Sequence, residues 1–89
     1  MILHITASDI EYSGRGAVLR RTPVENAVST RWPGTSITCG DGWVRVSSKI
    51  RGQRQWEYGD ALNKFMADWE ACKPVKPGWF RLREISGGN

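Results

Sequence analysis

The segment from Asp60 to Cys72 constrains the fold most, because it is a long amphipathic stretch. Its large apolar residues follow the spacing of one helical face: Leu62, Phe65, Met66 and Trp69. Asp60 is a candidate N-cap, since its carboxylate can accept hydrogen bonds from the amides of the first turn. Pro74 and Pro77 end the helix just after Cys72. A helix with so large an apolar face must pack on another element, and we expect a small sheet there.

Capping signals predict two more helical segments. Residues 6–9 match a capping box with Asp in place of Glu, which would open one short helical turn over residues 7–11. Residues 22–25 form a second capping box that has proline at the first helical position. We expect the second helix to end near Trp32, where a Pro-Gly pair follows.

Four segments have the alternation and flanking turn residues of strands, and they lie at residues 1–6, 35–39, 43–47 and 79–85. In the last of them, apolar residues alternate with Arg81 and Arg83, which predicts a strand with an outward basic face. Residues 47–57 are polar and basic, so we expect a loop or an irregular strand extension there.

The Gly-Asp-Gly sequence at residues 40–42 joins the second and third strands and leaves two registers open. A two-residue turn at its last two positions pairs Ile37 with Val46, whereas a turn at its first two positions shifts that partner by two residues. Either register places Trp43 and Arg45 on the face opposite the apolar residues.

The order of elements is therefore strand, helical turn, helix, strand, strand, helix, strand. This order predicts a small single α+β domain over residues 1–89, in which two helices pack on one face of an antiparallel sheet of three to four strands. Residues 86–89 are expected to form a frayed tail. The chain has neither a signal-peptide pattern nor the roughly 20 apolar residues of a membrane span. We therefore expect a cytoplasmic protein.

The chain offers few residues for catalysis or metal binding. His4, Cys39 and Cys72 are isolated from one another, whereas a metal site needs three or four ligands at suitable spacing. The carboxylates form no obvious catalytic pair. We expect no enzyme activity, no metal and no cofactor, and we expect the two cysteines to be buried, reduced thiols.

Basic and aromatic residues gather between residues 20 and 54. This segment holds seven Arg or Lys against two acids, in a chain of net charge +4. Cations track phosphates and flat rings stack on bases, while Arg and Trp are also enriched at protein–protein hot spots. The alternative is that the tryptophans are structural and the charges solvated. The candidate binding residues are Trp43, Arg45, Lys49, Arg51, Arg54 and Trp56.

Short motifs extend over most of the chain: Ile5-Thr6 with Asp9-Ile10 and Gly14, Pro23-Val24 with Ala27-Val28, Phe65 with Asp68, and residues 73–77 followed by Phe80 and Leu82. In these motifs the chain resembles a group of small uncharacterised proteins encoded by phages and prophages. That group often has cysteine at the position of Thr22, so any role of that cysteine is absent here. The resemblance implies a phage accessory protein and no particular activity.

Two functions of different classes follow. The first is a small non-enzymatic phage-type protein that binds a host protein or ribonucleoprotein complex and inhibits it, as anti-CRISPR proteins do. The second is a nucleic-acid-binding accessory or regulatory protein that uses the hairpin and residues 49–54.

Overall fold

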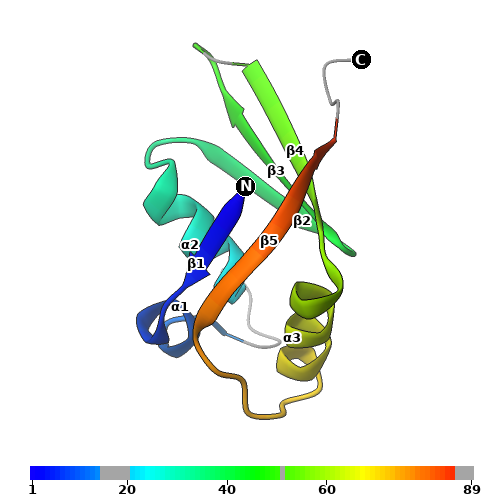
Figure 1. Ribbon diagram of the computed structural model, residues 1–89. Helices are drawn as coiled ribbons and strands as arrows, with labels where there is room; N and C mark the ends of the chain where they lie inside the picture. Colours follow the sequence, from blue (N-terminus) through cyan, green and yellow to red (C-terminus); the bar gives the residue numbers. More distant parts are fainter. Residues whose placement is uncertain (15–20, 51, 86–89) are drawn as a thin grey trace.

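The structure is a computed structural model, and it describes residues 1–14, 21–50 and 52–85 (Figure 1). The predicted tail at residues 86–89 lies outside these residues. The elements in chain order are β1 (Ile2–Ile5), α1 (Ala7–Glu11), α2 (Pro23–Arg31), β2 (Ser36–Gly40), β3 (Trp43–Ser48), β4 (Gly52–Tyr58), α3 (Asp60–Glu70) and β5 (Gly78–Ile85).

The strands form one antiparallel sheet in the order β1-β5-β4-β3-β2. The sheet curls, because α2 packs against both of its edge strands, β1 and β2 (Figure 1). α1 packs on α2, and α3 packs on β4 and β5. The predicted α+β class and antiparallel sheet are confirmed. The predicted count of three to four strands is too low, since the described residues form five strands. The helices α2 and α3 and the short α1 correspond to the two predicted helices and the predicted helical turn.

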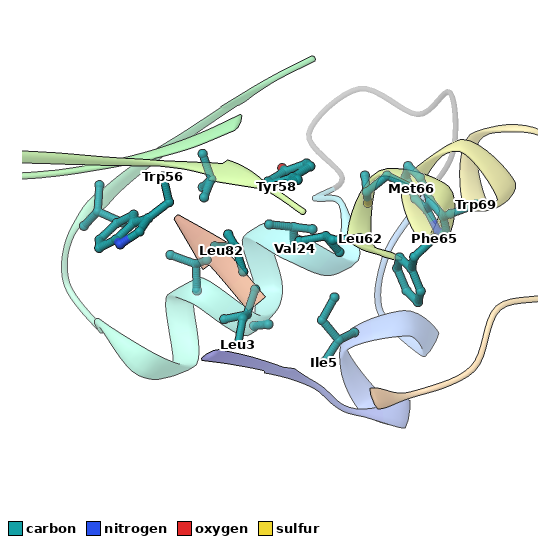
Figure 2. Packing of buried hydrophobic residues seen from close by; sticks show 14 residues of the cluster. Leu3, Ile5, Val24, Trp56, Tyr58, Leu62, Phe65, Met66, Trp69 and Leu82 are labelled. Carbon is teal, nitrogen blue, oxygen red and sulfur yellow. The ribbon is translucent and has the colours of Figure 1, made fainter. Parts of the chain in front are cut away.

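One hydrophobic core fills the space between the sheet and the helices (Figure 2). The predicted face of α3 is confirmed, since all four of its apolar residues are buried. The Trp69 indole Nε1 donates to Ser13 Oγ at 3.0 Å, and the Phe65 ring meets Phe80 edge-on at 5.1 Å between centroids. The remaining core residues come from every strand except β2 and from α2: Leu3, Ile5, Val24, Ala27, Val28, Val44, Val46, Trp56, Tyr58 and Leu82.

Two of the three described helices begin at the capping signals that the sequence predicts. Both predicted capping boxes, at the starts of α1 and α2, are present. The prediction for α3 is wrong at both ends. Gly59 is the N-cap and makes no side-chain capping bond. Asp60 is the first helical residue, and its negative charge there stabilises the helix through the helix dipole. The helix ends at Glu70, and Cys72 takes a left-handed conformation with φ of 62°.

The β2–β3 hairpin adopts the first of the two predicted registers. Ile37 pairs with Val46 and Cys39 with Val44 across a turn at Asp41 and Gly42. Gly42 has φ of 83°, a value that favours glycine and suits the tight turns of hairpins.

The prediction of a loop or an irregular strand extension over residues 47–57 is wrong for most of that segment. β4 is a central strand, paired with β3 on one side and β5 on the other. Only Trp56 and Tyr58 of its residues reach the core. The rest of the strand is polar because its other face meets solvent and because its first residues extend past the core (Figure 1).

Candidate functional site

The candidate site is the outer face of the sheet, which we define as the face opposite the core. Side chains alternate along each strand, and the registers therefore gather one set of residues on this face. None of its described residues is buried, and none of the helices in the described ranges packs over it. The residues relevant to binding are Ile2, His4, Trp43, Arg45, Gln55, Glu57, Trp79, Arg81 and Arg83.

Trp79 is the largest exposed side chain on the outer face, with 69% of its surface accessible. It pairs with His4 across β1 and β5, and the two rings stack with centroids 4.0 Å apart and 7° between their planes. Ile2 lies on the same face and is 50% exposed. These three residues form an apolar and aromatic patch at the β1 edge of the sheet.

Trp43 and Arg45 lie further along the outer face, and both are held against the sheet. The Trp43 indole lies across Gly40, its cross-strand partner, so closely that a Cβ atom there would collide with the ring. The Arg45 guanidinium lies 5.1 Å from the centre of that indole, and its Nε donates to Gln55 Oε1 at 3.3 Å. The ring and the guanidinium thus form an ordered, half-buried surface.

Charge on the outer face is mainly positive. Its strand residues within the described ranges include three arginines, Arg45, Arg81 and Arg83, against one acid, Glu57. Glu57 and Arg83 are directly opposite on β4 and β5 and form an ion pair. Arg81 is exposed and flanks the Trp79 patch.

The structure divides the six residues that the sequence analysis grouped as one patch. Trp43 and Arg45 lie on the outer face, whereas Arg54 and Trp56 point to the core side of β4. Trp56 is only 1% exposed and stacks on Trp32, so it cannot meet a partner as an exposed ring. Lys49 is exposed in the β3–β4 turn. Arg51 lies outside the described residues.

Trp79, His4 and Arg81 lie on the outer face but are not among the six binding residues predicted from the sequence. The alternation over residues 79–85 marked Arg81 and Arg83 as outward-facing and could have added Trp79 to that face. The contact between Trp79 and His4 had no local signal, because it depends on pairing between the first and last strands.

The cysteines differ from the prediction in burial. Both are free, but Cys39 is half-buried and Cys72 is exposed. Burial raises the pKa of the Cys39 thiol to about 11. Within the described residues, no group of three or more His, Cys, Asp or Glu is placed to hold a metal ion. No helix in those ranges is long and apolar enough to cross a membrane.

No protein-family model, curated protein or solved structure matches this chain. The fold and the site together define a small α+β protein whose curled antiparallel sheet leaves one basic and aromatic face open.

Proposed function

We propose that this protein is a phage-type accessory protein that acts by binding, without catalysis, in the cytoplasm of the host cell. It docks the outer face of its sheet on an acidic surface of a host protein or ribonucleoprotein complex and thereby inhibits that complex. The observation that carries this proposal is the exposed Trp79 on an open sheet face, with arginines beside it.

The chemistry of the outer face suits a protein partner. Exposed apolar clusters mark interaction sites, and Trp and Arg are the residues that most often dominate binding energy. Trp79 is the anchor in this proposal, and Ile2 extends its apolar area. The exposed Arg81 supplies positive charge that an acidic partner surface would complement.

The charge pattern favours protein over nucleic acid. A surface that binds nucleic acid tracks the phosphates with a row of cations. Here Arg83 is already paired with Glu57, and Arg45 is engaged by Gln55 and the Trp43 ring. Such engaged cations contribute less to phosphate binding than free ones, whereas the apolar patch around Trp79 adds to protein contacts.

A single-stranded nucleic acid is the second candidate partner, and the Trp79–His4 stack favours it. This pair presents flat rings on an open antiparallel sheet, an arrangement on which unpaired bases stack in RNA-binding domains. One stacked base contributes about 1–3 kcal/mol to binding.

The first experiment compares capture of host proteins from a lysate by the wild-type protein and by Trp79→Ala. We expect Trp79→Ala to weaken capture of the specific partner by at least about tenfold, as loss of a hot-spot residue does. Tyr12→Ala is the matched control, because Tyr12 is a 75% exposed aromatic residue at the end of α1 and not on the outer face. Equal capture by Trp79→Ala and the wild type would overturn the proposal.

A titration of labelled single- and double-stranded DNA and RNA tests the second candidate at about 50 and 200 mM salt, the range over which phosphate contacts weaken. Binding that falls steeply with salt, and whose salt slope drops by about one in Arg81→Glu, would favour nucleic acid. An absence of binding at the lower salt concentration would leave the protein-docking function as the sole proposal.

A further inference from the structure

A second candidate surface lies on the core side of the sheet, where the β3–β4 hairpin passes the end of α2. A cavity of about 500 Å³ opens there, within the range of about 300–1,000 Å³ that is typical of ligand pockets. We call it the indole groove. The residues that define it are Arg31, Trp32, Val46, Ile50, Arg54 and Trp56.

The floor of the indole groove is apolar and aromatic. Trp32, the C-cap residue of α2, stacks on Trp56 of β4 with centroids 5.0 Å apart and 21° between the rings. Within this stack Trp56 is the buried ring, while Trp32 keeps part of its surface accessible. Val46 of β3 completes the floor. This floor suits a large apolar side chain of a ligand.

The rim of the indole groove is basic. Arg31 lies over Trp32 and Arg54 over Trp56, each with its guanidinium carbon 5.0 Å from the ring centre. Arg54 also donates to both carboxylate oxygens of Glu84, from Nη2 at 2.7 Å and from Nε at 3.1 Å. These hydrogen bonds hold the pKa of Glu84 below its usual range. Glu84 therefore offsets the charge of Arg54, and Arg31 supplies most of the attraction for an anion.

Ile50 extends the apolar surface beyond the cavity. It lies in the β3–β4 turn and is 95% exposed. A small molecule bound against the Trp32 indole would leave Ile50 exposed, whereas a longer ligand that extends out of the cavity would cover it. A second copy of the chain is a poor occupant, because its net charge of +4 opposes the basic rim.

We propose that the indole groove is a second docking site for an acidic peptide segment of a partner protein, which places one large apolar side chain on the accessible part of the Trp32 indole, next to the buried Trp56 ring. Carboxylates beside that apolar residue pair with Arg31, and the chain continues over Ile50. This site is separate from the outer face and does not depend on the function proposed for that face.

Selection from a displayed library of random dodecapeptides tests the indole groove. We expect enriched sequences to combine acidic residues with an aromatic residue or leucine. Synthetic copies should shift the indole N–H resonances of Trp32 and Trp56 in ¹H–¹⁵N spectra and leave that of Trp79 unchanged. Of the five tryptophans, Trp32 and Trp56 report on the indole groove, and Trp43 and Trp79 report on the outer face.

Exposed residues provide variants that spare the core. We expect Arg31→Glu to weaken peptide binding by at least about tenfold and Ile50→Ser by roughly threefold to tenfold. Lys76→Glu makes the same charge change on the exposed connection between α3 and β5, and we expect less than about a twofold effect from it, because exposed charges far apart are screened.

Three results would overturn the proposal for the indole groove: no enrichment over the bare support, enriched peptides that shift Trp79 in place of Trp32 and Trp56, or unchanged binding in Arg31→Glu. None of these results bears on capture through Trp79, so the two proposals can fail separately.

Discussion

The hydroxyl of Tyr58 is a buried polar group whose removal we expect to stabilise the protein. Tyr58 is 8% exposed, and its oxygen, which is fully buried, has no hydrogen-bond partner among the described residues. The neighbouring Cys39 thiol is a weak hydrogen-bonding group. Burial raises the pKa of the Tyr58 phenol above its usual range. Tyr58→Phe removes the hydroxyl and keeps the ring that packs in the core.

The size of the effect follows from the burial. A buried polar group without a partner costs about 1–3 kcal/mol. A weak contact with the Cys39 thiol recovers part of this cost, so we expect Tyr58→Phe to raise the free energy of unfolding by about 1 kcal/mol. A gain of this size raises the melting temperature of a domain of this length by roughly 4–8 °C. Urea titrations and thermal melts followed by circular dichroism measure both quantities.

Tyr12→Phe is the matched control, because the Tyr12 side chain is exposed and its change should stay within about 0.5 kcal/mol. A loss of about 1 kcal/mol or more in Tyr58→Phe, with the control unchanged, would refute the reasoning and show that the hydroxyl is satisfied. A double-mutant cycle with Cys39→Ala would then measure whether the thiol is its partner.

Three further predictions test the core, the thiol and the outer face. Trp69→Ala should lower the free energy of unfolding by about 3–5 kcal/mol, since the indole is buried; an unchanged urea midpoint would contradict the placement of α3. Stability should fall between about pH 9 and about pH 11, because the unfolded Cys39 thiol loses its proton before the folded one, and Cys39→Ala should reduce that fall in melts across this range. Gly40→Ala should displace the Trp43 indole and shift tryptophan emission to the red; an unchanged spectrum would contradict the contact.

Features with local signals could be predicted from the sequence. The capping boxes of α1 and α2 join residues three positions apart, and the turn at residues 41–42 determines the β2–β3 register. The buried face of α3 follows from spacing within a single helix. In each case the partners are close in sequence, so few alternative arrangements compete with the observed one.

Features that depend on distant partners could not be predicted in the same way. β4 has few apolar residues, and its identity as a strand depends on its pairing with β3 and β5 on either side. Because the strand was not recognised, Trp56 and Arg54 had no assigned face and joined Trp43 in one predicted patch. The stack of Trp79 on His4 likewise requires the first and last strands to be neighbours, which alternation within either strand does not specify.

The alternation of β5 ties the candidate site to the core. Leu82 is 2% exposed, while Trp79 and Arg81 face outward from the same strand. A shift of its register by one residue would turn Leu82 to solvent and bury the two binding residues, so the pairing that stabilises the core also presents the outer face. Substitutions at Trp79 or Arg81 leave Leu82 in place. Their effects on binding can therefore be measured on a folded protein, and a loss of capture in Trp79→Ala can be assigned to the outer face rather than to unfolding.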